Sequence, residues 1–232
     1  MKHIKQFLKN ECSGWKVWEV IWLIVSSAVI IGLSIYWNDS LLGIISATTG
    51  VMCVVCTGKG KLSAYVFGVI NTLLYAIIAY NSKFYGEVML NVIYYFPMQF
   101  YGIYVWSKHM SPETHEVSKR EMKLKGKLIL GVIVVVATIG YGYLLKLMGG
   151  ALPYIDALST VISVVAMIVS IKMYAEQWIL WIIVNVVSVI MWAIAFAQGN
   201  DSIATLLMWV VYLVNAVVMY RKWLKEAKSN EV

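Results

Sequence analysis

Three uncharged amides inside apolar stretches are the first sign of chemistry in this chain. Asn71, Asn91 and Gln99 fall in two segments that are each long enough to cross a bilayer. An amide placed in hydrocarbon is strongly unfavourable unless another group bonds to it. Residues 62–106 therefore predict either a polar cavity within the membrane or a tight interhelical hydrogen-bond network.

Helical spacing places these amides on faces that also carry aromatic rings. Asn91, Tyr95 and Gln99 follow one another at intervals of four residues and so form one stripe. Aromatic faces stack on planar rings or cover cations, and amides bond to hydroxyl and carboxamide groups. The stripes favour a binding site for a flat heterocycle that carries a sugar. Two further stripes are Phe67, Asn71 and Tyr75, and Trp178, Trp181, Asn185, Ser188 and Trp192.

The composition is that of an integral membrane protein. Of the 232 residues, 61% are hydrophobic and 13% are charged, whereas soluble domains average roughly 45–50% apolar and about 25% charged residues. The predicted fold class is all-α, with about eight transmembrane helices, most of them close to the ~20 residues that a span requires. These segments are 17–37, 41–57, 62–80, 85–106, 127–147, 152–171, 177–197 and 202–223.

The distribution of positive charge gives an independent indication of topology. With the N-terminus inside and eight crossings, only Lys83 and Lys146 of the 19 basic residues fall in outer loops. Lys and Arg concentrate in cytoplasmic loops, so both termini are expected to be cytoplasmic. The net charge of +7 then reflects orientation and contact with anionic lipid, and nucleic acid is not expected as a partner.

Polarity and loop pattern repeat along the chain. Spans two to four match spans six to eight, and an even number of spans separates each helix from its counterpart, which predicts parallel repeats. The first span has no counterpart, so we expect it to be peripheral. The expected segments are an N-terminal interfacial segment and helix (1–38), a first three-helix repeat (40–106), a basic cytoplasmic loop (107–126), a linker helix (127–148), a second repeat (152–223) and a cytoplasmic tail (224–232).

Titratable groups are missing from the predicted midplane of the spans. Ion-coupled carriers usually place such a group there, so facilitated diffusion is favoured over ion-driven transport. Catalysis would need acid–base pairs or metal ligands at suitable spacing, and we expect no enzyme, cofactor or metal. Cys53 and Cys56 form a C-x-x-C in an apolar helix, where packing is the favoured interpretation. Each amide or ring named above could also serve helix packing alone.

The residues resemble the PnuC family of bacterial nicotinamide riboside transporters. The matching stretches are GKGKLSAYVFGVINTLLYAIIAYNSKFYGE, NVIYYFPMQFYGIYVW and QWILWIIVN. The resemblance implies a SWEET-like arrangement of three, one and three helices in the inner membrane, and uptake of the riboside down its gradient, sustained by phosphorylation in the cytosol. It carries the binding role onto Gln99, Trp181 and Asn185 and, by position, onto Asn71 and Tyr95. Ser188, on the face of Asn185, completes the expected set.

Other interpretations remain open at the level of sequence. Relatives in the wider family carry thiamine or riboflavin, and these similarities do not separate such substrates from the riboside. A membrane subunit that captures a vitamin for a separate energising complex is the alternative from another functional class. The oligomeric state is undetermined, with a homo-oligomer among the alternatives.

Overall fold

Helices form almost the whole structure, a computed structural model that describes residues 2–147, 153–199 and 203–229. Only isolated bridges, Met110 to Val117 and Arg120 to Tyr174, occur among the described residues, which contain no strand. The all-α class is confirmed. The elements are α1 (Lys2–Glu11), α2 (Val17–Tyr36), α3 (Leu41–Lys59), α4 (Ser63–Asn81), α5 (Tyr85–Met89), η1 (Leu90–Tyr95), α6 (Phe96–Ser107), α7 (Leu124–Leu147), α8 (Pro153–Ile171), α9 (Gln177–Ala197) and α10 (Ile203–Ser229).

Among the residues that the structure describes, six helices are long and apolar enough to cross a membrane: α2, α3, α4, α7, α9 and α10. The predicted span 85–106 is instead made of three consecutive elements, α5, η1 and α6. The predicted span 152–171 coincides with α8, whose apolar part Ala157–Ile171 is shorter than the other spans. The structure therefore supports a multi-pass helical membrane protein, and the eight crossings stay a prediction.

The chain forms two compact units. The first comprises Met1–Ser118 and Ser188–Asn215, and the second comprises Lys119–Val187 and Ala216–Val232. Parts of the predicted segments fall outside the described residues: the end of the linker helix and the start of the second repeat at 148–152, the loop at 200–202, and the terminal residues 1 and 230–232. The division into two repeats stays a prediction.

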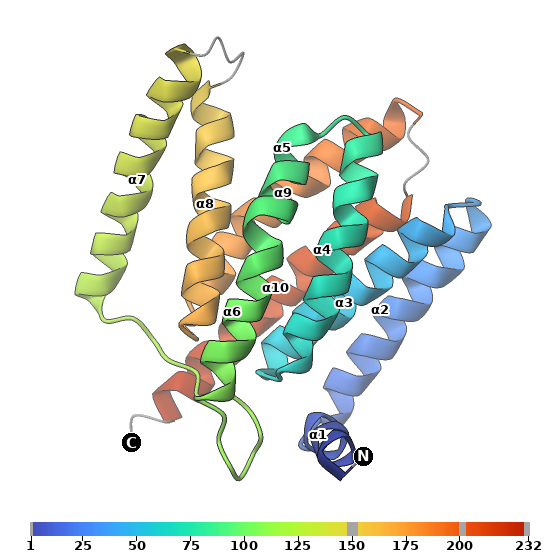
Figure 1. Ribbon diagram of the computed structural model, residues 1–232, viewed down its shortest axis with the longest axis vertical. Coiled ribbons are helices and arrows are strands. Elements are labelled where there is room, and N and C mark those ends of the chain that lie inside the picture. Colours follow the sequence, from blue (N-terminus) through green and yellow to red (C-terminus); the bar gives the residue numbers. More distant parts are fainter. Residues whose placement is uncertain (1, 148–152, 200–202, 230–232) are drawn as a thin grey trace. The chain divides into compact units, whose positions relative to one another are not determined.

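The first unit contains a tight hairpin of α3 and α4, with α2 packed along α3 (Figure 1). Ser40 caps α3 by accepting a hydrogen bond from the Gly43 backbone N–H at 3.0 Å. At the other end Gly60 adopts φ 88°, a left-handed conformation that glycine adopts without a steric penalty. Its N–H donates to the Cys56 carbonyl at 2.9 Å. These two signals fix where α3 begins and ends, and they set the turn into α4.

The π-helical element η1 ends at Tyr95, two residues before Pro97. Proline has no backbone N–H and its ring clashes with the carbonyl four residues earlier, so an ordinary α-helix cannot continue unchanged through it. A π turn widens the helix locally and accommodates such a defect. The Asn91 side chain, 4% exposed, donates to the Glu87 carbonyl at 2.9 Å in the same region. The stretch thus stays helical while its side chains are rotated relative to a regular helix.

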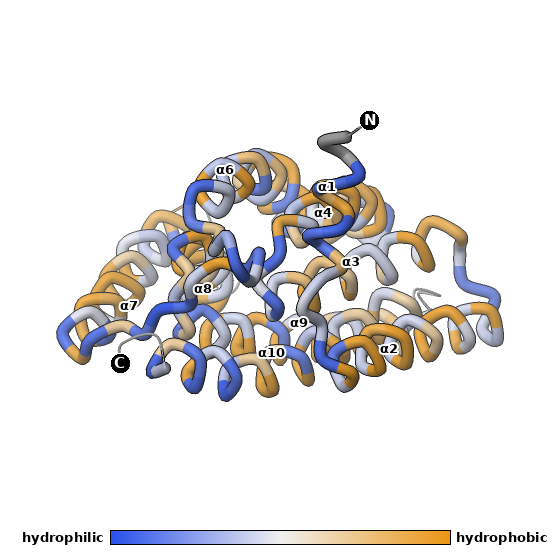
Figure 2. Tube along the Cα trace, turned by 90° about the horizontal axis from the view of Figure 1, so that it is seen from below, coloured by the Kyte–Doolittle hydropathy of each residue, from blue (hydrophilic) through white to orange (hydrophobic). Residues whose placement is uncertain are grey.

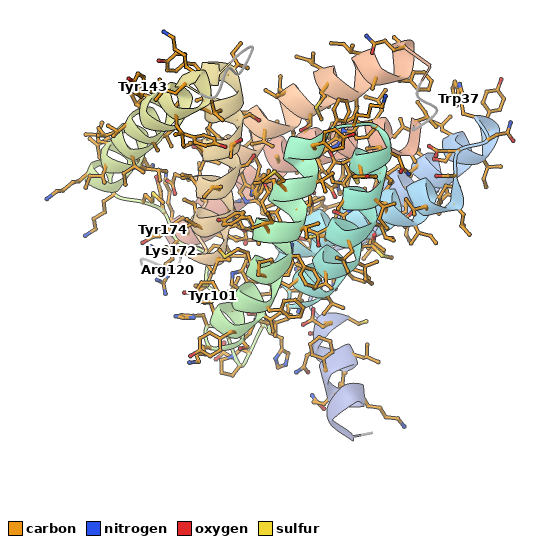
Figure 3. All side chains as sticks on the ribbon, turned by 45° about the horizontal axis from the view of Figure 1, so that its top comes forward. Trp37, Tyr101, Arg120, Tyr143, Lys172 and Tyr174 are labelled. Atoms are coloured by element: carbon orange, nitrogen blue, oxygen red, sulfur yellow. The ribbon has the colours of Figure 1, made fainter. Side chains whose placement is uncertain are left out.

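The second unit contains the helical hairpin of α7 and α8 (Figure 1). The ring of Tyr154 packs where a side chain on Gly142 would lie, so the two helices approach closely there. Most residues of α7 are apolar (Figure 2). Many of their side chains are exposed, as expected for contact with lipid. Near the end of α8, Arg120 and Tyr174 lie together (Figure 3), and backbone hydrogen bonds join Arg120 to Met173 and Ala175 at 2.9 Å.

Buried charges join α2, α3 and the loop after α6 in the first unit. The Lys59 ammonium lies 3.0 Å from carboxylate oxygens of both Glu19 and Glu116. Lys59 is 4% exposed and Glu19 1%. Lys61, fully buried, donates to backbone carbonyls that include Asn10 at 2.9 Å and His115 at 3.1 Å. Because buried charges are tolerated only when paired, this network fixes the segment before α2 and the loop around the α3–α4 turn.

Replacing Lys59 by methionine should lower the stability of the protein strongly. The substitution leaves the Glu19 carboxylate buried without its cation, which typically costs about 3–5 kcal/mol. Thermal unfolding of detergent-purified protein measures the effect. K225M, which removes an exposed lysine of α10, is the control and should melt like wild type. The double variant E19Q/K59M should recover part of the loss, and equal melting temperatures for K59M and wild type would contradict the role of the network.

Candidate functional site

Helices α4 and α6 in the first unit pack closely because small and large side chains alternate across their contact. A side chain added at Gly68 of α4 would overlap with the Gln99 amide of α6, and one added at Gly102 of α6 would overlap with the Tyr65 ring of α4. The Tyr65 ring also meets Trp106 edge-to-face, with centroids 4.9 Å apart. Sequence numbers rise on one helix as they fall on the other, so the two helices run antiparallel.

Gln99 is buried but keeps its hydrogen-bonding capacity. The side chain is 6% exposed and lies against Gly68. Its amide forms no hydrogen bond to any residue that the structure describes. Buried polar side chains are nearly always bonded, so an amide left open in this way is suited to a bound molecule. Gln99 thus fits the binding role predicted for it, which stays a prediction.

Asn71 occupies a different environment, in which its amide links three helices of the first unit. Its Nδ2 donates to the Ser46 carbonyl of α3 at 2.8 Å, and the Tyr212 hydroxyl of α10 donates to its Oδ1 at 3.4 Å. The Met208 sulfur lies 3.6 Å from the same Nδ2. A side chain at Gly50 would collide with these groups, so α3 approaches them closely. The geometry gives Asn71 a structural function, and its predicted contact with substrate stays a prediction.

Asn215 on α10 was not among the predicted residues, although the rule that selected Asn71 applies to it. It is fully buried in the apolar span. Its Nδ2 donates to the Val54 carbonyl at 3.2 Å, and the Trp22 indole N–H of α2 donates to its Oδ1 at 3.2 Å. An asparagine inside an apolar segment was the available signal. Asn215 joins α2, α3 and α10, so its role here is structural.

Helix α9 carries three of the predicted residues on one face. Trp181, Asn185 and Ser188 are spaced by four and three residues, which places them on one side of the helix. Asn185 and Ser188 are each 3% exposed, and Trp181 is half-buried. The Asn185 amide forms no hydrogen bond to any described residue. Trp181 and Asn185 belong to the second unit and Ser188 to the first. Asn185 in the second unit is therefore like Gln99 in the first: each carries a buried amide that has no hydrogen bond to a described residue.

Tyr95 is the remaining predicted residue, and it lies at the end of η1. Its ring is half-buried and meets the ring of Tyr94 at 5.6 Å between centroids. The predicted alignment of Asn91, Tyr95 and Gln99 assumed regular α-helical spacing. The π turn over Leu90–Tyr95 changes the angular offset of the first two residues from Gln99. The stripe is therefore altered, although all three residues lie on one continuous helical stretch.

An aromatic cluster in the first unit is centred on Tyr75. The Trp192 indole N–H donates to the Tyr75 hydroxyl at 3.0 Å, and the Tyr75 ring meets Trp209 with centroids 5.7 Å apart. The Glu87 carboxyl group lies close to that hydroxyl. Phe84 packs edge-to-face on Trp192. The sequence placed Tyr75 and Trp192 on the polar faces, but the grouping with Glu87 depends on the fold.

The amides and aromatic rings described above are suited to hydrogen bonding and stacking. Among the described residues, no three His, Cys, Asp or Glu side chains come together as they would around a metal. The available amides of Gln99 and Asn185 can each donate and accept hydrogen bonds, and aromatic rings can stack on a planar solute. Six long apolar helices among the described residues define a multi-pass helical membrane protein, and the buried amides are candidates for contact with a solute.

Comparison with known proteins gives the family. The model of the family described as nicotinamide mononucleotide transporter matches residues 40–225, and the chain belongs to this family, whose members are transporters and not enzymes. The nicotinamide riboside transporter PnuC of Neisseria mucosa is 41% identical over 94% of this chain and 84% of its own length. The PnuC of Haemophilus influenzae is 37% identical over 95% and 96%.

A solved structure agrees with this assignment. The crystal structure of the vitamin B3 transporter PnuC is 38% identical and covers 97% of this chain and 98% of its own, with a TM-score of 0.87. The resemblance to PnuC expected from the sequence is confirmed at the level of family and overall fold.

The two kinds of buried amide should respond differently to truncation. Asn71→Ala removes hydrogen bonds to Ser46 and Tyr212 and should lower the unfolding free energy by about 1–3 kcal/mol. Asn185→Ala removes an amide that has no partner among the described residues and should change stability little or raise it. Thermal unfolding without ligand measures both. A large loss for N185A, equal to that of N71A, would show that Asn185 is structural.

Proposed function

We propose that this chain takes up nicotinamide riboside by facilitated diffusion across a bacterial inner membrane. Two facts support the proposal. The chain belongs to this transporter family, with relatives named for the riboside, and the buried amides of Gln99 and Asn185 have no hydrogen-bond partner among the described residues. The nicotinamide ring bears a carboxamide, which such amides can bond through both its N–H and its C=O. The pyridinium charge suits aromatic faces.

The charge of the helices that carry these amides favours the riboside over the mononucleotide. A phosphate group carries about −1.5 to −2 charges at neutral pH and is usually bound by Arg or Lys. Helices α4, α6 and α9 contain no lysine or arginine. The buried Lys59 at the end of α3 is already paired with Glu19 and Glu116. A neutral ribose therefore fits these helices better than a ribose phosphate.

Movement across the membrane is proposed to follow alternating access between two like-oriented triplets, 40–106 and 152–223, in a SWEET-like arrangement. The π turn before Pro97 is a place where a helix can bend, because its hydrogen bonding is already irregular. Both termini are proposed to be cytoplasmic, from the bias of Lys and Arg toward one side. Transport of this kind requires no separate energising subunit. Either a monomer or a homo-oligomer of this chain could carry it out.

Purified protein in liposomes tests transport. Labelled nicotinamide riboside should equilibrate across the vesicle wall without ATP or an ion gradient, and nicotinamide mononucleotide should not. Empty liposomes are the control. Uptake only after addition of a partner complex would favour the alternative that the chain is a vitamin-capturing subunit. Tighter binding of thiamine or riboflavin than of nicotinamide riboside would indicate that one of these vitamins is the substrate.

Variants of the predicted site test binding. Trp181→Ala and Asn185→Ala should each weaken riboside binding by about tenfold or more, since each removes a stacking surface or a buried hydrogen bond. Calorimetry on folded protein measures the affinity. Asn81→Ala, at an exposed position at the end of α4, should bind like wild type. Unchanged affinity in both site variants would remove these residues from the site.

A further inference from the structure

Gly68 occupies a position where the helix itself would favour another residue. It lies in the interior of α4, Ser63–Asn81, and glycine destabilises a helix interior relative to alanine. Its backbone is not in the left-handed region, so no turn or cap requires glycine here. The reason for the glycine is therefore the space beside it.

That space is filled by the end of a single side chain. The three atoms nearest to a Cβ built on Gly68 are Oε1, Cδ and Nε2 of Gln99, all less than 3.0 Å away. Real Cβ atoms do not approach other atoms so closely, so the carboxamide occupies the space that a side chain on Gly68 would take. The amide is thereby held in one place although it forms no hydrogen bond to any described residue.

A buried amide without partners is expected to be mobile or to seek a hydrogen bond elsewhere. At Gln99 the packing against Gly68 confines the side chain, which is 6% exposed. A group that is positioned in advance loses less entropy when it binds a ligand. It also discriminates strongly against ligands that cannot bond to it, because the buried polar group then stays unpaired.

We propose that Gly68 is a positioning residue for substrate specificity: its missing side chain holds the Gln99 carboxamide where it reads the carboxamide of the solute. This inference rests on the proposed function and extends it to a residue that does not itself bond to the substrate. The chemistry recognised is a primary amide on a planar ring, because two amides can exchange N–H to C=O hydrogen bonds reciprocally.

The α4–α6 contact provides a matched control. A side chain at Gly102 would also overlap with a neighbour across the same pair of helices, but that neighbour is the Tyr65 ring rather than an amide. Gly102→Ala and Gly68→Ala therefore disturb helix packing in comparable ways. Only the change at Gly68 displaces Gln99.

The experiment compares the binding of nicotinamide riboside with that of the pyridinium riboside that lacks the carboxamide, by calorimetry on purified protein. Wild type should prefer nicotinamide riboside by about tenfold or more. Gly68→Ala should reduce this preference to within about twofold, as should Gln99→Ala. Gly102→Ala should keep the preference even where its melting temperature falls.

The possible binding results distinguish failure of the role of Gly68 from failure of the proposed function. A folded Gly68→Ala protein that keeps the wild-type preference overturns the inference, as does an equal loss in Gly102→Ala. Wild type that binds both ribosides equally also overturns it while leaving riboside transport intact. Wild type that binds neither riboside overturns the proposed function itself.

Folding of the variant is controlled separately. If Gly68→Ala does not fold, the double variant G68A/Q99N should fold, because the shorter asparagine leaves room for the added methyl group. The double variant should also lack the preference for nicotinamide riboside. Failure of the double variant to fold would place the collision somewhere other than Gln99 and overturn the inference.

Discussion

The requirement that polar groups in hydrocarbon find a partner governs this structure. Each amide in an apolar helix must bond to another part of the protein, to water or to a solute. Asn71 and Asn215 bond to neighbouring helices, and they act as fixed connections within the first unit. Gln99 and Asn185 have no such bonds among the described residues and so retain the capacity to bind. The same chemical group thus occurs in two kinds of surroundings, bonded to neighbouring helices in one and without such bonds in the other.

Those surroundings explain how far the sequence could lead. Composition and the length of the apolar segments predicted an all-α membrane protein, because these properties depend on local residues alone. The spacing of polar residues selected Asn71, Gln99 and Asn185 as unusual. The partners of Asn71 could not be foreseen, because Ser46 and Tyr212 are brought to it by packing between segments distant in the chain. Spacing identifies a face of a helix but does not say what covers it.

Local irregularity limited the prediction in a second way. The aligned stripe of Asn91, Tyr95 and Gln99 assumed a uniform helix, and the π turn at Leu90–Tyr95 interrupts that uniformity. The only local sign was Pro97, which predicts a disturbed hydrogen-bond ladder without stating how the chain absorbs it. The grouping of Tyr75, Trp192 and Trp209 likewise depends on three helices meeting. Aromatic content alone predicts membrane-interface residues equally well.

The pairing of Lys59 with Glu19 crosses the boundary of the region that the family model matches. The family model matches the chain from residue 40 onward, yet the carboxylate that neutralises a buried lysine of the matched region comes from α2, outside it. Trp22 of α2 likewise bonds to Asn215 within the matched region. A chain trimmed to residues 40–225 would retain the match to the family model but lose counter-charge and hydrogen bonding in its interior. The region that the family model matches is therefore smaller than the set of residues that completes the packing of its own interior.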